Sequence, residues 1–592
     1  MRQRHLPPDL FRSAFIEAPR PTDNLRTMND RRRQRMTQHI ALLRIVVAQE
    51  LLHYPTTPQT DWRQLSKEFP LTKRSIKEHW TITKPAVKAR GGMVSSQHHL
   101  ASDAGLEVLQ DGGNAIDAAI ATGLMLGVVE PWMSGFGGGG YLLAYLAKED
   151  RVVQIEFGMQ APAASKASDY PLEPGGANAS DAFNWPKVIQ DRNIHGPLAI
   201  ATPGYFRGIE LASKTWGSRP LSHLIEPARQ QAEQGLPVDW FTSQKINHSA
   251  RGLRTYEGTR SVYLSDGLPP AINLDGFVEY MPLPHLGQTL GAVQQEGAKA
   301  IYDGALTQSI LEDLAHAGSH ISRSDLQDYS AHATSPLSSQ YRDHHIFTAG
   351  PLTAGPSLLQ ALEHVRPDLT KGGDAPDADD YVSIARALQA TYQNRLKNLG
   401  EGALGGNTTH ICVADSDGNM VSLTQTIMSA FGARILLPQT GLLMNNGMMW
   451  FDPRPGGPNS VLGRRRPLCN MCPTLARMGD GTWIALGACG GRKIFPSVFQ
   501  LLLFMLDYSM DVDETVHQPR IDVSGTDIVT MMAQLPESVQ AAIEDNFEQT
   551  WIRPNGVAPN HFALPQVIAR KPDGPMAGAC FVPSPHAKVA SY

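Results

Sequence analysis

Cysteine is scarce in this chain. The 592 residues include only five, and all of them lie in the last third: Cys412, Cys469, Cys472, Cys489 and Cys580. An odd number gathered at one end argues against a disulfide framework and favours a reducing compartment. We therefore predict a cytoplasmic protein.

Long apolar runs and a strong net charge are also lacking. No uninterrupted apolar run approaches the roughly 20 residues of a membrane span, and residues 1–36 contain no apolar segment typical of a secretory signal. The net charge of -5 and the pI of about 6.5 give no electrostatic reason to expect a nucleic acid or an anionic membrane as a partner. With 42% hydrophobic and 18% charged residues, the composition is that of an ordinary globular protein.

Signals for a metal or a cofactor are weak. Cys469 and Cys472 have the spacing of half a zinc site, but no second Cys pair or His cluster follows at ligand spacing, and Pro473 comes directly after them. We expect no metal and interpret the two as small residues that line a cavity. The glycine run Gly137 to Gly140 opens a strand rather than a helix, and no acidic residue follows at the place a dinucleotide site requires. We expect no cofactor there and predict close packing beneath the active site.

Residues 1–83 differ from the rest of the chain. Residues 1–36 carry nine Arg and several Pro, and residues 40–53 have apolar side chains at helical spacing. A transit peptide would look similar, but the acidic residues among the first 30 count against one. We prefer to interpret this segment as an upstream extension of unknown role.

From Lys84 onward, strands stand at both ends of the chain with helices between them. The patterns predict helices at 101–109, 115–129, 221–233, 382–396 and 498–506, and strands at 141–146, 151–157, 411–414, 420–424, 441–444 and 483–487, with a further strand pair near the C-terminus. This order predicts an α+β layered fold.

The most informative stretch is Asn407-Thr408-Thr409-His410, between a Gly-rich loop and a buried-looking strand. Cleavage before Thr408 would give that residue a free α-amine beside its own hydroxyl, so that base and nucleophile share one residue. An α-amine has a pKa of about 7.7–8.0, close to working pH. The pattern therefore predicts a self-processing chain with Thr408 as nucleophile, whereas Thr409 fits an ordinary strand position.

The surrounding motifs resemble the γ-glutamyltransferase (γ-glutamyltranspeptidase) family over residues 84–592. The motifs, in chain order, are Ser96-Gln97-His98, Gly112-Gly113-Asn114, Glu130-Pro131, Ser134-Gly135, Ala201-Thr202-Pro203-Gly204, Thr424-Gln425-Thr426, Phe431-Gly432, Leu443-Met444-Asn445-Asn446, Arg466-Pro467-Leu468, Pro473-Thr474 and Gly490-Gly491. The resemblance implies a four-layer αββα sandwich, the fold of the N-terminal nucleophile (Ntn) hydrolases. It also implies a precursor cut into a large subunit, 84–407, and a small subunit, 408–592.

Catalytic roles carried over from the family fall on four residues. Thr408 would attack first the Asn407 carbonyl and then the substrate, and Thr426 would support it, although Thr426 also fits a plain strand position. Gly490 and Gly491 would supply oxyanion-binding N–H groups, where a simple glycine turn is the alternative.

The chain departs from the family where γ-glutamyl groups are held. Phe157-Gly158 stands in place of the arginine clamp, Met428 in place of an Asn, Gly447 and Trp450 in place of a Gln and an Asp, and Cys469-Asn470 in place of a serine pair. A site that has lost these charged anchors suits a different acyl group. We predict substrate contacts at Trp450, Cys469, Asn470, Arg492 and Lys493, with Phe451 as a further wall. The alternatives are a core position for Trp450 and solvated positions for Arg492 and Lys493.

The overall prediction is an enzyme that hydrolyses or transfers an acyl group through a threonyl acyl-enzyme. Its substrate would be a small amide or γ-glutamyl compound, not necessarily glutathione, and its acceptor water or an amine. The alternatives are an oxamate-type or acylase-like amidohydrolase, a secondary-metabolite C–C hydrolase and, in another class, a non-catalytic ligand-binding homologue. Retention of Thr408, Thr426, Gly490 and Gly491 argues against a pure binder.

Overall fold

The computed structural model describes residues 82–175, 185–369, 373–395, 407–524, 527–557, 560–572 and 574–592, with residue 407 described through its backbone. Residues 82–592 form one compact unit. The predictions for the N-terminal extension, including its helix at 40–53, lie outside the described residues.

Two seven-stranded antiparallel sheets form the centre of the fold. The first sheet has the order β1 (Val87–Ala89), β18 (Met576–Cys580), β17 (Leu564–Arg570), β13 (Trp483–Cys489), β12 (Thr474–Arg477), β9 (His344–Thr348) and β8 (Leu337–Tyr341). The second has the order β19 (Lys588–Ser591), β2 (Met93–Ser96), β10 (Asn407–Ala414), β11 (Met420–Met428), β3 (Gly139–Leu146), β4 (Arg151–Phe157) and β7 (His332–Thr334). Both sheets therefore mix strands from before and after Thr408.

The two sheets pack face to face. The Ser422 hydroxyl on β11 donates to the Leu486 carbonyl on β13 at 3.1 Å. A Cβ on Gly487 would lie 2.2 Å from the His410 ring, so only glycine lets β13 approach β10 this closely. Apolar side chains such as Leu143, Cys412 and Ile568 fill the space between the sheets.

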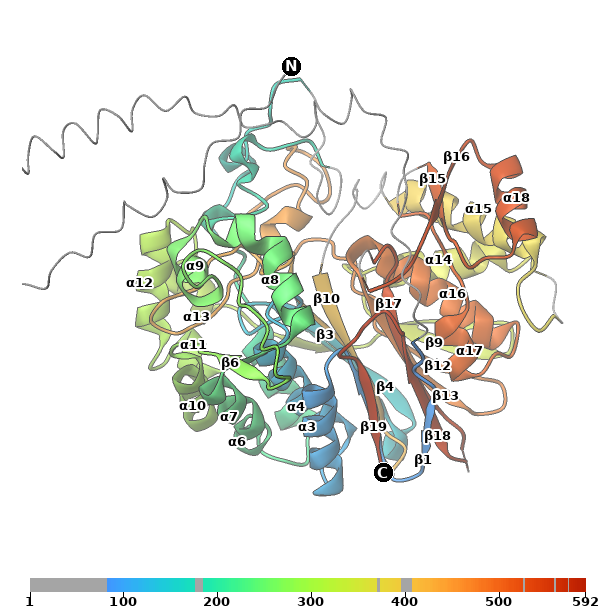
Figure 1. The fold of residues 1–592 in the computed structure, drawn as a ribbon, viewed down its shortest axis with the longest axis horizontal. Coiled ribbons are helices and arrows are strands. Elements are labelled where there is room, and N and C mark those ends of the chain that lie inside the picture. The colour runs from blue at the N-terminus through green and yellow to red at the C-terminus, as the bar shows by residue number, and fades with distance from the viewer. Residues whose placement is uncertain are drawn as a thin grey trace, which may run out of the picture. The chain divides into compact units, whose positions relative to one another are not determined.

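Helices cover both outer faces (Figure 1). The second sheet packs against α3 (His99–Gln110), α4 (Ala115–Val129) and α5 (Tyr205–Trp216), while α7 (Glu226–Gln234) packs on α4 and α10 (Leu286–Glu296) packs on α7. The first sheet packs against α14 (Gly355–Val365), α16 (Ile494–Leu506) and α17 (Val512–His517), while α15 (Ala378–Asn394) packs on α14. The layers are αββα, which confirms the predicted Ntn-hydrolase architecture.

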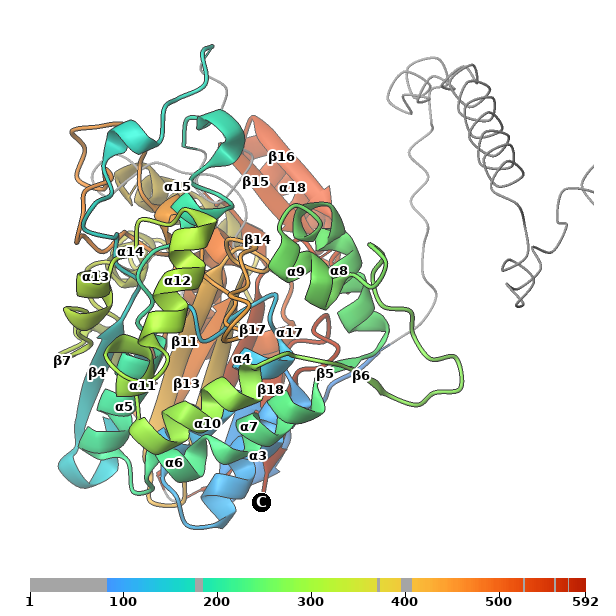
Figure 2. The same ribbon diagram turned by 90° about the vertical axis from the view of Figure 1, so that its left-hand side faces the viewer.

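Smaller elements surround this sandwich (Figure 2). They are the helices α6 (Leu221–Leu224), α8 (Trp240–Leu253), α9 (Glu257–Tyr263), α11 (Lys299–Tyr302), α12 (Thr307–Ala317), α13 (Arg323–Gln327) and α18 (Glu537–Asn546), the paired strands β5 (Leu236–Val238) and β6 (Glu279–Met281), and a small sheet of β14 (Ile521–Asp522), β15 (Ile528–Met532) and β16 (Gln549–Arg553). Several 3₁₀ turns, including η8 (Gly447–Trp450) and η9 (Gly491–Lys493), connect the larger elements.

Most predicted elements are present. Asn114 caps α4 through a reciprocal capping box with Asp117, because its side chain accepts from the first-turn N–H groups. The helix expected at 221–233 is divided into α6 and α7 at Ile225, with a proline in the first turn of α7. The C-terminal strand pair is β17 and β18.

The strand predicted at 441–444 is wrong. Leu443 and Met444 make only isolated bridges, to Leu436 and Gly137. Both edges of β11 are already occupied, by β10 and β3, so this apolar segment cannot join the sheet there. It packs instead as a loop over the end of the strands.

Candidate active site

A β-bulge marks the start of β10. Asn407 pairs with Met428 and Thr409 with Gln425, so two residues of β11, Thr426 and Ile427, stand opposite Thr408 alone. Bulges bend a strand and redirect its side chains, and they occur often beside active sites. The irregularity therefore falls on the residue predicted to be the nucleophile.

The bulge brings two hydroxyls together. Thr408 Oγ1 lies 3.4 Å from Thr426 Oγ1, and Thr408 is only 4% exposed. Thr426 Oγ1 also accepts from the Met428 N–H at 2.8 Å, and Met428 has a left-handed φ of 85°. A non-glycine residue in this conformation stores backbone strain, which is common where a site must be held in one geometry.

On the other face of β10, Thr409 contacts a buried acid. Its hydroxyl donates to Glu130 Oε2 at 3.3 Å, and Glu130 ends α4. Burial raises the pKa of Glu130 to about 8, although the Thr409 hydrogen bond and the charge of Lys245 oppose the rise. Sequence reasoning used Glu130 only as part of a motif. An acid directly after an apolar helix was the available signal.

Gly490 and Gly491 follow the end of β13. Their φ values, 138° and 62°, suit glycine, and a Cβ on Gly490 would lie 2.9 Å from the Ala563 Cα. Glu130 contacts Thr409 and also raises the pKa of the neighbouring Cys489 thiol, whose main shift comes from burial. The glycine pair therefore lies at the same end of the sandwich as Thr408.

The predicted close packing of the glycine run is present beneath these strands. A Cβ on Gly138 would lie 2.1 Å from the Thr426 carbonyl oxygen, and one on Gly140 would lie 2.5 Å from that of Thr424. Glycine there lets the loop that leads into β3 lie directly against β11.

An apolar cluster occupies the region of the lost glutamyl anchors. Its buried members include Tyr141, Met159, Trp185, Met428, Met448, Met449, Trp450, Phe451, Cys469 and Met471. Met428 connects this cluster to Thr426 through its N–H. Trp450 is 3% exposed and packs within this cluster, as its core alternative requires, and its contact with substrate stays a prediction.

Cys469 and Asn470 are held by a buried arginine that sequence reasoning missed. Arg395 donates to the Cys469 carbonyl at 2.7 Å, to Asn470 Oδ1 at 3.4 Å and to the Thr353 carbonyl at 3.1 Å. Burial raises the pKa of the Cys469 thiol to about 12 and that of Cys472 to about 11, so both thiols stay protonated.

Arg492 and Lys493 have different environments. Arg492 is 2% exposed, which makes the solvated alternative wrong for it. Its Nη1 and Nη2 atoms have no hydrogen-bond partner, and burial lowers its pKa to about 10. Lys493 is half-buried and donates to the His561 carbonyl, in the loop that packs on Gly490.

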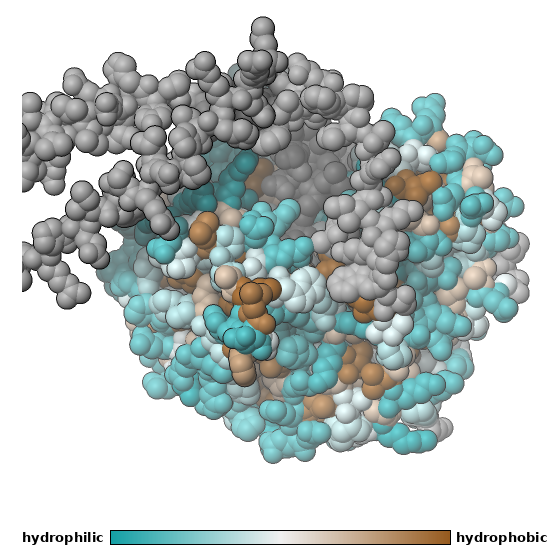
Figure 3. Space-filling model, viewed as in Figure 1, coloured by the Kyte–Doolittle hydropathy of each residue, from teal (hydrophilic) through white to brown (hydrophobic). Residues whose placement is uncertain are grey.

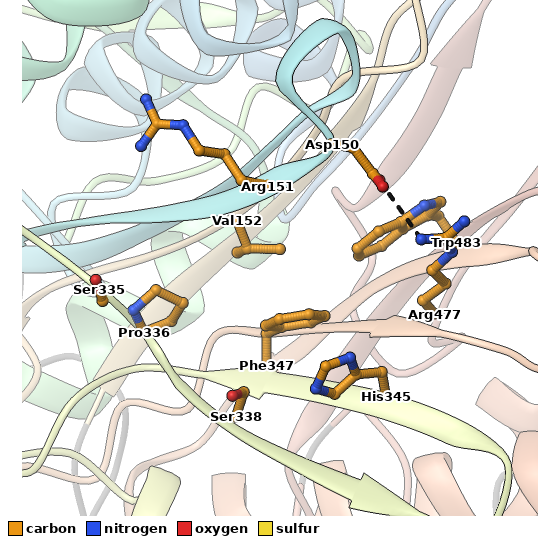
Figure 4. Close-up of a pocket in the computed structure, with 10 residues that line it drawn as sticks. All are labelled: Asp150, Arg151, Val152, Ser335, Pro336, Ser338, His345, Phe347, Arg477 and Trp483. Carbon is orange, nitrogen blue, oxygen red and sulfur yellow. Dashed lines mark hydrogen bonds and ion pairs between the residues drawn. The ribbon is translucent and has the colours of Figure 1, made fainter.

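A separate cavity of about 390 Å³ lies at the other end of the sandwich (Figure 4). Arg477 stacks on Trp483 and reaches Asp150 at 3.5 Å, while Val152 and Phe347 face the opening. Tyr145 stacks on Trp483 in the cavity wall and pairs with Met420, six residues along β11 from Thr426, which is about 20 Å at strand spacing. This cavity is therefore remote from Thr408.

Neither a metal cluster nor a membrane-spanning helix is found in the part of the chain that the structure describes. No group of three or more His, Cys, Asp or Glu side chains there could hold a metal ion. Within the same residues, every helix is too short or too polar to cross a bilayer.

The sequence matches the family model described as Gamma-glutamyltranspeptidase over residues 101–407 and 403–581. The chain belongs to the gamma-glutamyltranspeptidase family. It is therefore an enzyme of the Ntn-hydrolase class that hydrolyses or transfers acyl groups, as the sequence predicted.

Individual relatives divide between two names. The chain is 32% identical to an acylase ACY 1 proenzyme of Pseudomonas sp. (strain V22), over 84% of this chain and 92% of that protein. It is 29% identical to the glutathione hydrolase proenzyme of Bacillus subtilis (strain 168), over 73% of this chain and 80% of that protein. In fold it is similar to the crystal structure of a cephalosporin acylase from Bacillus halodurans, with a TM-score of 0.75, 22% identity, and 88% and 99% of the two chains covered.

Proposed function

We propose that the chain cuts itself between Asn407 and Thr408 and then uses Thr408 as the nucleophile of an amidohydrolase. The supporting observation is the pair of Thr408 and Thr426 hydroxyls, 3.4 Å apart in a bulge. The products would be the large subunit, 84–407 with its upstream extension, and the small subunit, 408–592.

Self-cleavage proceeds as an acyl shift. Thr408 Oγ1 attacks the Asn407 carbonyl carbon and its proton passes to the departing Thr408 nitrogen, so the C–N bond breaks and an ester forms. Water then opens the ester, leaving a carboxylate on Asn407 and a free α-amine on Thr408. An unperturbed α-amine has a pKa of about 7.7–8.0, which suits the role of base in the next cycle.

Turnover repeats the attack on a substrate amide. The Gly490 and Gly491 N–H groups stabilise the negative charge on the acyl oxygen, and the Thr426 hydroxyl holds the nucleophile in place. Water or an amine then takes the acyl group from Thr408.

The apolar cluster favours a less polar acyl group than γ-glutamyl. Met428, Met449 and Trp450 are buried in one cluster, which Met428 joins to Thr426, and methionine adapts readily to flat or irregular apolar groups. Gly158 stands where the family has its clamp arginine, and a Cβ there would lie 3.0 Å from the buried Tyr141 hydroxyl oxygen. We assign Trp450 and Phe451 to the wall of the acyl site and Cys469 and Asn470 to its rim.

A γ-glutamyl substrate is the second candidate because of one observation. Arg492 has two terminal nitrogens without a partner directly after the oxyanion glycines, and a guanidinium fork suits a carboxylate. The Lys493 ammonium donates a hydrogen bond to the His561 carbonyl, so this residue would orient the loop rather than bind substrate.

Intact mass of the wild type beside Thr408→Ala tests the cleavage. In proportion to chain length, the 64.5 kDa precursor should yield fragments of about 44 and 20 kDa, and the variant a single chain. The processed enzyme is then given phenylacetyl and γ-glutamyl anilides at equal concentration. Faster release from the phenylacetyl compound supports the apolar acyl site, and faster release from the γ-glutamyl compound supports the second candidate. An uncut wild type contradicts the proposed mechanism.

For location we propose the cytoplasm. All five Cys are free and buried, which suits a chain that folds in reducing conditions. Cell fractionation with subunit-specific detection is the direct test.

A further inference from the structure

An exposed apolar arm projects from the large-subunit half. Residues 264–278 leave the end of α9 and return through β6, whose strand partner is β5 alone. Figure 2 shows this segment extending away from the layers of the fold. Leu274 is 92% exposed, Phe277 74%, Leu268 63% and Val278 52%.

The exposure is concentrated. Of the 13 large hydrophobic side chains exposed in the described part of the chain, six lie between residues 268 and 280: Leu268, Ile272, Leu274, Phe277, Val278 and Tyr280. At roughly 150–200 Å² for a side chain of this size, they expose about 600 Å² of apolar surface. That approaches the ~800 Å² that one partner buries in a stable protein interface. Figure 3 views the molecule along the direction of projection, where brown hydrophobic atoms stand forward beside teal polar ones.

An apolar pocket lies between the two ends of the arm. It has a volume of about 490 Å³, and its wall includes Val262 just before the arm, Pro284 just after it, and Leu436 and Leu437 from the loop that follows β11. The two acidic residues of its wall already have partners, since Glu257 pairs with Arg260 and Asp313 accepts a hydrogen bond from the Gln439 N–H. The arm does not fill the pocket, because its own apolar side chains are exposed.

Charges on this face are complementary. Residues 264–284 contain three acids, Asp266, Asp275 and Glu279, and no Lys or Arg. Beside the arm, α8 exposes Arg251, and the residue that caps this helix, Arg254, is exposed and donates to the Gly267 carbonyl of the arm at 2.8 Å. An acidic arm is repelled by an anionic membrane, whereas it suits a basic surface that also offers an apolar pocket.

Because the arm and the pocket share one face, each can serve the other across a two-fold axis. We propose that the chain forms a symmetric dimer in which the arm of each copy inserts Leu274 and Phe277 into the apolar pocket of a second copy. Neither Thr408 nor the oxyanion loop takes part, so the proposal is independent of the catalytic assignment.

Sedimentation velocity of the purified protein over a concentration series tests the proposal, where one copy means the large and small subunits together. The wild type should contain two copies, and Leu274→Asp combined with Phe277→Asp should raise the dissociation constant of the dimer at least tenfold. A pocket-filling variant, Ser261→Trp, should do the same from the other side, since Ser261 is exposed and lines the pocket. The matched control is Trp551→Asp, which changes an equally apolar side chain, 45% exposed, on β16.

Two results overturn the proposal. One is a wild type that stays monomeric at about 50 μM, well above the dissociation constants of most specific dimers; the arm would then close on its own pocket or meet a different partner. The other is a dimer whose strength is unchanged in both the arm and the pocket variants. Circular dichroism and anilide turnover of each variant establish that it remains folded.

Discussion

The two regions that we propose around Thr408, a reactive region and a recognition region, are built differently. The reactive region consists of a bulged strand pair, two hydroxyls and two glycines, where backbone geometry sets every position. The recognition region consists of methionine and aromatic side chains that pack as a cluster. The first cannot change without moving the backbone, whereas the second can accept other apolar residues at modest cost. Chemistry and substrate choice can therefore diverge separately in this fold.

The largest effect is expected at the reactive backbone. Gly490→Ala should lower kcat by about 10²–10³-fold, since the new Cβ would meet Ala563 and displace the oxyanion N–H groups. Steady-state kinetics of the purified, processed protein measure it. Gly457→Ala is the control, because its Cβ has more room. Unchanged kcat would show that the glycine pair is only a turn.

Removing the second hydroxyl should have a somewhat smaller effect. Thr426→Val leaves Thr408 without its hydroxyl neighbour and the Met428 N–H without an acceptor, so processing and kcat should each slow by roughly 10²-fold. Thr426→Ser keeps the hydroxyl and should restore most of both rates. Equal loss in the two variants would indicate a packing role instead.

A substitution in the recognition region should change which acyl group the enzyme prefers. Met449→Ala enlarges the apolar cluster and should lower kcat/KM for the phenylacetyl anilide about tenfold, with little change in the rate of self-cleavage. Comparing kcat/KM for short and long acyl anilides measures the shift. If self-cleavage slows as much as turnover, the two regions are not separable.

The smallest effect concerns pH. Glu130 has its pKa raised to about 8 by burial, so between about pH 4.5 and 8 it is protonated in the folded chain and ionised in the unfolded one. The unfolding free energy of the wild type should therefore fall as pH rises through this window. Glu130→Gln should lose that fall and gain relative stability near pH 8.

Melting temperatures of wild type and Glu130→Gln from pH 5 to 9 provide the measurement. Glu149→Gln, at an exposed position, should run parallel to the wild type. Parallel curves for Glu130→Gln as well would contradict the buried-acid interpretation.

Local patterns in the sequence singled out the Thr408 segment and the capped helix that begins at Ala115. Thr426 and the glycine pair were carried over from the family resemblance, and their roles stay predictions. Residues that act across long separations gave no such sign. Glu130 reaches Thr409 over 279 positions, and Arg395 reaches Cys469 over 74. Contacts of this kind depend on which layers stack, and that information is not contained in any single window of residues.

Strand assignment failed for the same reason. Residues 441–444 have strand-like composition, yet a strand needs a free neighbour, and β11 has none. Nothing in the sequence marks the arm at 264–278, because its apolar residues are interrupted by Pro and Gly, a pattern typical of an ordinary loop.

The strand order carries a consequence for the lifetime of the enzyme. A cut between Asn407 and Thr408 would leave β10 paired on one side with β2 of the other chain, while β19 pairs with the far edge of β2. Two chains interleaved in this way could not separate without breaking strand pairs in both sheets. Folding would be a first-order event that the precursor undergoes once, whereas recovery after denaturation would require two chains to find each other at a rate set by dilution. The mature enzyme would therefore remain active because it unfolds slowly, and once unfolded it would refold poorly.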